Sequence, residues 1–507
     1  MLKRTPTGTW LPAWVPESTL TLSFLLVVCS TVQSATNGYD GSMLNGLNIL
    51  PSYTDYFQLT PATTGLNTAS VFIGSTLGTL VAGVLTDTLG RRPTIFLASI
   101  FALIGVALQT SAQNIAMFVV ARIVLGLGSA MSGVSSGVYL SETFPSRWRT
   151  WGVGLLNDFY YVGALIAAGV TLGTGQWQST WAWRAPSLIQ GIFSILCIII
   201  LPFVPESPRW LVHKGHFEYA RTSVAQTNSN GDTLDPVSVA IYKEIVDALD
   251  WEKKEGRTMS PKEIFKTPTA RKRLLIGASA GPFSCIAGNI IASYYLNNEL
   301  TMAGITDTND QLKANVVLNV FCLLCALGGS YLSGTAGRKP TAIVSQTLLI
   351  IFLFVIGGLT KIYGDNPSGA STSLVYGNVA VIFLFQGAYS LAWTPLLYLY
   401  PPEYSIRANG LAFSALSLNL LACVLVYVMP IGLTNIGWRM YMINGSWDII
   451  VLGLIIVFWI ETKGRTLEEI DAIFDGEKHS SVPDVEMIRT GQATIDVGAI
   501  EQQLKSE

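Results

Sequence analysis

The sequence predicts an all-α membrane protein with twelve transmembrane helices in two related six-helix halves. Of its 507 residues, 50% are hydrophobic and 13% are charged, whereas an average soluble domain is about a quarter charged. The hydrophobic residues gather in runs of about 20, long enough to cross a hydrocarbon layer about 30 Å thick. Short motifs of the first half also return in the second. This composition excludes a secreted or cytosolic enzyme.

Twelve apolar runs, each bounded by charge, proline or glycine, are candidate spans. Backbone groups in lipid must be satisfied within the segment, so each run is expected to form a helix. In chain order the runs cover residues 18–46, 64–87, 94–112, 114–140, 150–173, 183–202, 273–298, 312–333, 341–361, 374–400, 407–434 and 439–460. The polar leader before residue 18 and the long first run favour a retained first helix over a cleaved signal peptide.

The placement of basic residues predicts the orientation. With the N-terminus on the inner side, 26 of the 31 Lys and Arg residues fall on inner segments. The outer side keeps Arg184, Lys313, Lys361 and Arg439, and Arg122 lies inside a span. The positive-inside rule then puts both termini in the cytoplasm and requires an even number of spans. We expect a multi-pass integral protein of the plasma membrane.

Three motifs occur twice at similar spacing. Residues 90–94 (GRRPT) return at 337–341 (GRKPT), Glu142 with Arg149 is matched by Glu403 with Arg407, and residues 205–209 are echoed at 461–465. The repeats divide the chain into a six-helix half (1–202), a cytoplasmic linker (203–272), a second half (273–460) and a cytoplasmic tail (461–507). Duplicated halves are typical of transporters with a midplane site, where rocking of the halves gives alternating access.

Six motifs together resemble one known family. They are Gly38-Tyr39-Asp40, Asp87-x-x-Gly90-Arg91-Arg92, Arg122-x-x-x-Gly126-x-Gly128, Val204-Pro205-Glu206-Ser207-Pro208-Arg209, Tyr294-Tyr295 and Glu461-Thr462-Lys463-Gly464-Arg465. In this order they resemble the sugar porter family of the major facilitator superfamily, and most of all its fungal hexose and lactose-permease-like branch. The resemblance runs from about residue 30 to residue 475. It implies the major facilitator fold and transport of a small molecule.

Two ionisable residues inside spans, Asp40 and Arg122, are the first functional candidates. A charged side chain at the centre of a membrane helix costs about 2.5–3.5 kcal/mol or more unless it is paired or hydrated. The resemblance implies that Asp40 takes up a coupling proton and that Arg122 tunes it, which favours proton symport. The alternative is a constitutive structural ion pair. Asp158 is either a second protonatable or substrate-facing group or a residue that reaches inner water, and Asp448 is expected to be a packing residue.

The resemblance also implies a set of inner charges that latch the cytoplasmic helix ends together when the carrier faces outward. These residues are Asp87, Arg91, Glu142, Arg149, Glu206, Arg209, Arg338, Glu403, Arg407, Glu461 and Arg465. Gly334 stands where the second half would match Asp87, so we expect a weaker latch there. The alternative is that these residues only set the topology.

A sugar-binding site typically contains side-chain amides, which both donate hydrogen bonds to hydroxyls and accept them, and an aromatic ring that packs against the apolar face of the sugar. The resemblance places such residues at or beside the family positions: Asn157, Asn289, Asn319, Trp393, Tyr398 and Asn419, with Tyr294 and Tyr295 as an outer gate. Ala164, Ser284 and Cys285 stand where the family has amides, which favours a larger or less polar cargo.

The expected function is therefore transport of a sugar or sugar-like molecule, with a proton. The alternatives are a carrier of a quinate-like acid, polyol or secondary metabolite, and a transporter-like nutrient sensor. We expect no enzyme, cofactor, metal site or nucleic-acid partner, because the sequence holds no nucleophile–base pair, phosphate loop or metal-ligand spacing.

Overall fold

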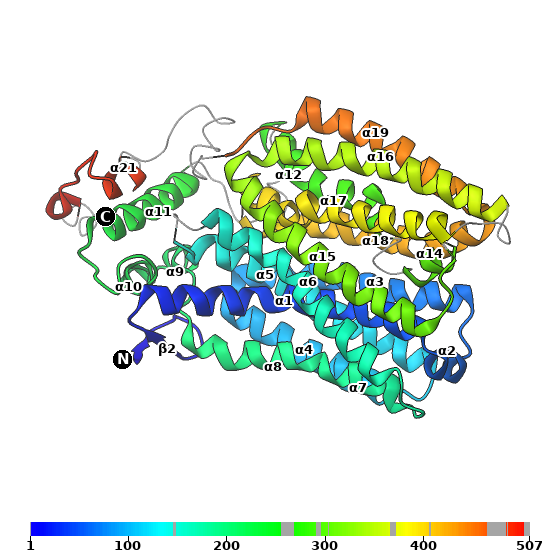
Figure 1. The fold of residues 1–507 in the computed structure, drawn as a ribbon. Coiled ribbons are helices and arrows are strands. Elements are labelled where there is room, and N and C mark those ends of the chain that lie inside the picture. The colour runs from blue at the N-terminus through cyan, green and yellow to red at the C-terminus, as the bar shows by residue number, and fades with distance from the viewer. Residues whose placement is uncertain are drawn as a thin grey trace.

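The computed structural model describes residues 2–145, 149–254, 268–290, 296–302, 304–365, 372–404, 407–463, 483 and 485–500. Within them, eleven helices are long and apolar enough to cross a membrane. These helices run side by side as one bundle, while a smaller group of helices lies at the end that also holds the N-terminal strands (Figure 1). The chain is a multi-pass membrane protein.

The first half contains α1 (Thr19–Ile49), α2 (Pro51–Phe57), α3 (Pro61–Leu89), α4 (Arg91–Thr110), α5 (Ile115–Thr143), α6 (Arg149–Thr174), α7 (Trp181–Ile189), α8 (Gly191–Ile200) and the 3-10 turn η2 (Leu201–Phe203). Polar caps start several of them, because the first N–H groups of a helix need acceptors. Ser18 caps α1 and Asn114 caps α5, and Thr60 forms a capping box with Thr63 at the start of α3.

The second half contains α12 (Pro268–Ser284), the π-helical turn η4 (Cys285–Asn289), α14 (Leu296–Met302), α15 (Thr308–Thr335), α16 (Arg338–Asp365), α17 (Thr372–Tyr404), α18 (Arg407–Ile436) and α19 (Arg439–Phe458). The run 273–298, which we expected to be one helix, is interrupted. Pro282 lacks the N–H that a helix interior needs, and Gly288 has φ 86°, a conformation that glycine adopts readily. The seventh span is a broken helix.

The segment between the halves, expected as a polar linker, contains α9 (Pro208–His213), α10 (Phe217–Asn228) and α11 (Pro236–Lys254), and α21 (Val485–Arg489) packs against α11. Trp210, Val224 and Ile245 belong to their shared hydrophobic core. The leader, for which no secondary structure was predicted, contains β1 (Leu2–Thr5) and β2 (Ala13–Pro16), which pair as an antiparallel hairpin. Short-range patterns in these polar segments were too weak to predict either feature.

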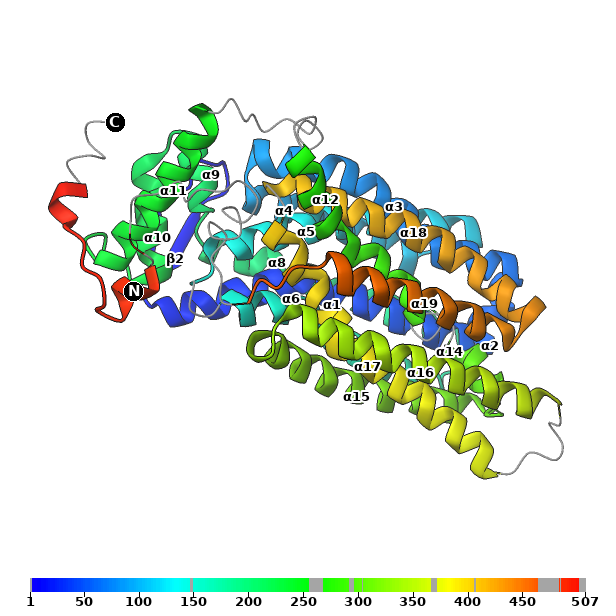
Figure 2. The ribbon, with the colours of Figure 1, turned by 90° about the horizontal axis from the view of Figure 1, so that it is seen from above.

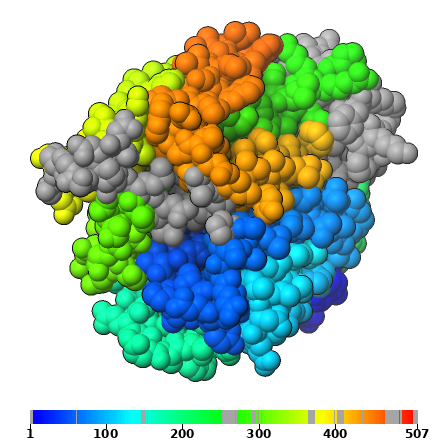
Figure 3. Space-filling view, turned by 90° about the vertical axis from the view of Figure 1, so that its right-hand side faces the viewer, coloured from blue at the N-terminus to red at the C-terminus, as the bar shows by residue number. Residues whose placement is uncertain are grey.

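The two halves pack against each other along their length. α3 lies against α18, and α6 lies against α15 and α17. Figure 2 shows α3 beside α18 at the bundle edge, and Figure 3, a view onto the end near α2 and α14, shows the blue and cyan first half beneath the orange and green second half. Any site between the halves is therefore lined by helices of both.

Within the first half, α1 and α6 cross at very close range through two glycines. A Cβ on Gly38 would overlap the backbone carbonyl of Tyr160, and a Cβ on Gly163 would overlap the carbonyl of Ala35. Small residues at such crossings let membrane helices approach closely, where packing drives association.

Replacing Gly163 by Leu should therefore prevent correct assembly. Overpacking costs about 1–3 kcal/mol even where side chains can move, and here the obstacle is backbone. We expect loss of the monodisperse peak in size-exclusion chromatography of the detergent-purified protein. Gly169 lies on the same helix, and a Cβ added to it would meet no atom within 4 Å. Gly169→Leu is therefore the matched control and should elute like wild type, and equal behaviour of the two variants would contradict the tight crossing.

Candidate functional site

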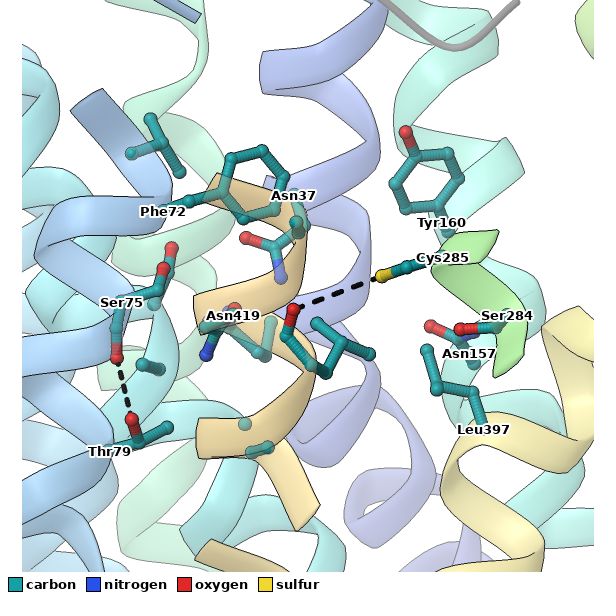
Figure 4. A pocket seen from close by; sticks show the side chains of 18 of the residues that line it. Asn37, Phe72, Ser75, Thr79, Asn157, Tyr160, Ser284, Cys285, Leu397 and Asn419 are labelled. Carbon is teal, nitrogen blue, oxygen red and sulfur yellow. Dashed lines mark hydrogen bonds between the residues drawn. The ribbon is translucent and has the colours of Figure 1, made fainter. Parts of the chain in front are cut away.

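A cavity of about 200 Å³ lies between the two halves. Its walls come from α1, α3, α5 and α6 of the first half and from α12, η4, α17 and α18 of the second. Figure 4 shows Asn37 and Phe72 on one side of this space and Ser284 and Cys285 on the other. The broken seventh span contributes to the wall, which fits the rule that irregular backbone at membrane depth lines a cavity.

An ion pair stands at the edge of the cavity. Both terminal nitrogens of Arg122 on α5 donate to Asp40 on α1, each at 2.9 Å. Arg122 is fully buried, whereas Asp40 also lines the cavity. Such a bidentate pair is strong and geometrically fixed, and its carboxylate is the member that cavity water or cargo can reach.

Other helices of the first half hold this pair in place. The Nε of Arg122 donates to the carbonyl of Asn67 on α3 at 2.9 Å, and the amide of Gln190 donates to Asp40 at 3.3 Å. A proton added to Asp40 would weaken its bond to Arg122 and leave the guanidinium to find another partner. The arrangement thus links a proton on α1 to the packing of α3 and α5.

Three of the sequence-predicted amides, Asn157, Asn289 and Asn419, line the cavity. Asn157 is engaged, because its nitrogen donates to the carbonyl of Thr394 at 2.7 Å and its oxygen accepts from Ser34 at 3.4 Å. The bond to Thr394 ties α6 of the first half to α17 of the second. Asn157 therefore joins the halves in the state that the structure describes.

The other predicted site residues fall elsewhere. Trp393 does not line the cavity: it is fully buried in the second half, donates to Gln346 at 3.0 Å and packs edge-on against Trp459. Asn319 lines a smaller pocket and donates to Asn315. The predicted gate residues Tyr294 and Tyr295, and the side chain of Tyr398, lie outside the described residues.

Two cavity residues escaped the sequence analysis. Gln33 and Asn37 lie on α1 and line the cavity together with Asp40. The three positions are i, i+4 and i+7, which fall on one face of a helix. This spacing of polar residues within an apolar run was the signal that would have found them.

At the end of the first half that lies against α9, Arg91 binds two acids. Its guanidinium donates to both oxygens of Glu142 at 2.9 Å and to Asp87 at 3.4 Å. Glu206 accepts from the backbone N–H groups of Arg91 and Arg92 at 3.1 and 3.3 Å, so it caps α4. Burial raises the pKa of the Glu206 carboxyl, against the charge of Arg92.

The second half repeats this cap. Glu461 accepts from the backbone N–H groups of Arg338 and Lys339, both at 3.0 Å, at the start of α16. Gly90 and Gly337, which precede the two caps, have φ 102° and 108°, and a Cβ at either would crowd the capping carboxylate. The duplicated motif therefore has one geometry in both halves.

The structure says less about several other predicted latch residues. Arg209 has a partner in the structure. Arg465 and the side chains of Arg149, Glu403 and Arg407 lie outside the described residues. The ion pairs of Arg91 join helices of the first half with one another, so in this state they brace that half internally.

Three further carboxylates are buried within the bundle. Asp158 on α6 accepts from Ser330 on α15 at 2.5 Å, another contact between the halves. Asp448, expected as a packing residue, is fully buried and accepts from Asn444 at 3.5 Å. Glu299 on α14, which the sequence analysis did not single out, accepts from Tyr441 at 3.4 Å. The sequence did not predict its burial, because the expected seventh span ended at residue 298, just before Glu299.

Comparison with known proteins identifies the family. The chain is 28% identical to the MFS-type transporter criB of Aspergillus cristatus over 480 residues, which are 92% of this chain and 98% of that protein. It is 27% identical to a high-affinity glucose transporter of Kluyveromyces lactis over 457 residues, 86% of this chain and 82% of the relative.

The fold agrees with these relatives. A structure of the proton:xylose symporter XylE bound to 6-bromo-6-deoxy-D-glucose matches with a TM-score of 0.77 at 22% identity, covering 90% of this chain and 100% of that chain. XylE is a protein of E. coli. The likeness shows the major facilitator fold. Residues 26–474 match the profile of the family described as "Sugar (and other) transporter", and the chain belongs to that transporter family.

Proposed function

We propose that the protein is a secondary active transporter that moves a sugar or sugar-like molecule together with a proton. The observation that carries this proposal is the Asp40–Arg122 pair on the wall of a cavity between the two halves. A carboxylate at membrane depth is expensive unless it is functional or paired, and this one is both paired and open to the cavity. The glucose transporter among the relatives and the symporter XylE support sugar and proton as the two cargoes.

In this proposal residues 1–202 and 273–460 are the two units that rock about the cavity. Asn157–Thr394 and Asp158–Ser330 join them in the present state, so both contacts must break or slide when the inner side opens. The inner network of Arg91, with the capping carboxylates Glu206 and Glu461, fixes the helix ends that the motion repositions. The distribution of basic residues along the chain supports cytoplasmic termini, and we assign the protein to the plasma membrane.

A second candidate is a carrier of a less polar metabolite. The cavity is lined in part by Ile290, Leu397 and Leu418. The thiol of Cys285 donates a hydrogen bond to the carbonyl of Leu418 at 3.8 Å, so it is not free to bind a hydroxyl. Burying a hydroxyl against such residues without a partner costs a few kcal/mol. An alkylated or deoxygenated compound fits these residues better than a sugar that carries hydroxyls on every edge.

Uptake in a transport-deficient host tests the proposal. Labelled hexoses, disaccharides, polyols and quinate are offered at acidic and at neutral external pH. We expect uptake of at least one sugar or polyol and a higher uptake rate at acidic external pH, because more of the co-transported proton is then available outside. If none of these hydroxylated compounds is taken up, the second candidate is favoured. Sugar uptake at a rate independent of external pH would contradict proton coupling.

A further inference from the structure

The amides of the cavity differ in whether the protein already uses them. Five amide side chains line it: Gln33, Asn37, Asn157, Asn289 and Asn419. Asn157 is bonded to Thr394 and Ser34, and Asn289 to Tyr389. In the described part of the chain no side-chain hydrogen bond is found for Gln33, Asn37 or Asn419. Three amides are therefore available to a ligand.

Two of these available amides lie on α1. Gln33 and Asn37 are one helical turn apart, at a spacing that brings side chains of a helix within about 5–6 Å of each other. Gln33 is only 4% exposed, so its amide meets the cavity and little else. A cargo hydroxyl that bonds to such an amide contributes about 0.5–1.5 kcal/mol of net stabilisation.

Part of the opposite wall is an apolar strip that offers no partner to a hydroxyl group. This wall is formed by α12, η4 and α18, where Ile290, Leu418 and Ala422 line the cavity. Ser284 also lines it, but its hydroxyl donates to the carbonyl of Gly281 at 2.7 Å. Asn419 is an available polar group on this side, and Figure 4 shows it in the same space as Asn37. The second half therefore contributes an apolar strip, Ile290, Leu418 and Ala422, beside its polar lining residues, whereas α1 contributes only polar residues to the cavity. The polar lining residues of the second half are Ser284, Asn289, Tyr389, Thr394, Ser414 and Asn419.

We propose that Gln33 and Asn37 are specificity-determining residues that bind the hydroxylated edge of the cargo. The apolar strip of Ile290, Leu418 and Ala422 then selects a cargo that lacks a free hydroxyl where it meets this strip, such as a deoxy or O-alkyl sugar or polyol. This inference rests on the transport function proposed above and names its substrate class. It also places bound cargo close to the proton site, because hydroxyls held by Asn37 would lie one helical turn from Asp40 on the same face of α1.

The test uses purified protein in liposomes and measures counterflow of the labelled cargo that wild type exchanges best. Gln33→Leu and Asn37→Leu each remove one amide and should raise KM about tenfold, the value of one hydrogen bond of about 1.4 kcal/mol, with little change in maximal rate. Asn37→Gln keeps an amide and should restore much of the affinity. Asn48→Leu is the matched control, since Asn48 lies on α1 but away from the cavity, and its KM should equal that of wild type.

Competition completes the test. A hexose, its monodeoxy derivatives and its O-methyl ethers compete against the labelled cargo, and at least one derivative should compete better than the parent hexose. If wild type exchanges no sugar or polyol, the proposed function itself fails. If it exchanges cargo while both Leu variants keep the wild-type KM, or the parent hexose outcompetes every derivative, the inference is overturned and the transport function stands.

Discussion

Replacing Asp40 by Asn should abolish uphill accumulation of the cargo while leaving exchange intact. An asparagine cannot carry the proton, so a pH gradient no longer drives uptake. A gradient of one pH unit supports about tenfold accumulation at one proton per cargo, and the variant should stop where the inner and outer concentrations are equal. Accumulation and counterflow in liposomes with an imposed pH gradient measure both properties.

The variant also leaves Arg122 buried without its carboxylate, and breaking a buried pair costs about 3–5 kcal/mol. Counterflow therefore has a second purpose, because it shows that the variant is folded. Asp310→Asn is the matched control: Asp310 pairs with Lys313 on the surface, and both side chains are more than half exposed. That variant should accumulate cargo like wild type. Undiminished accumulation by Asp40→Asn would exclude this residue as the coupling site.

Replacing Arg91 by Ala should slow the transport cycle severely without changing which cargo is preferred. The change leaves Glu142 and Asp87 at the inner end without their shared cation, and Arg91 itself is only 2% exposed. The loss of about 3–5 kcal/mol expected for a broken buried pair should appear as a lower melting temperature and a lower maximal rate. Initial rates for two competing cargoes, measured together, give the selectivity.

Lys313→Ala supplies the comparison for this variant. It breaks an exposed pair, worth at most about 1 kcal/mol, so stability and rate should stay near those of wild type. A change of selectivity in Arg91→Ala with an unchanged rate would contradict the proposed bracing role of the inner network and place Arg91 in cargo binding.

The sequence predicted the spans and the repeated inner motifs because both depend on local chemistry. A run of about 20 apolar residues in lipid must satisfy its backbone groups internally and so forms a helix. The GRRPT and GRKPT motifs adopt the same capped turn in both halves. The broken seventh span was not predicted. Pro282 is visible in the sequence, but whether a proline kinks or ends a membrane helix depends on the neighbouring helices that satisfy the freed backbone groups.

The site was predicted in part, for a related reason. Asp40 and Arg122 stand out because a charge inside a span is rare, and the structure places them in contact. Trp393 does not line the cavity, because a motif position fixes a helix but not the rotation of its face, which packing decides. Gln33 and Asn37 were missed because single polar residues are common near helix centres, and only their shared spacing with Asp40 marks a cavity face.

The central claim is that cargo and proton cross the membrane together through Asp40. The most direct test is to load liposomes that contain the purified protein with a pH-sensitive dye and to impose an inward gradient of the cargo identified by uptake, without any initial pH difference. The account predicts acidification of the lumen that follows cargo entry and disappears in Asp40→Asn. Cargo entry at constant internal pH would contradict it.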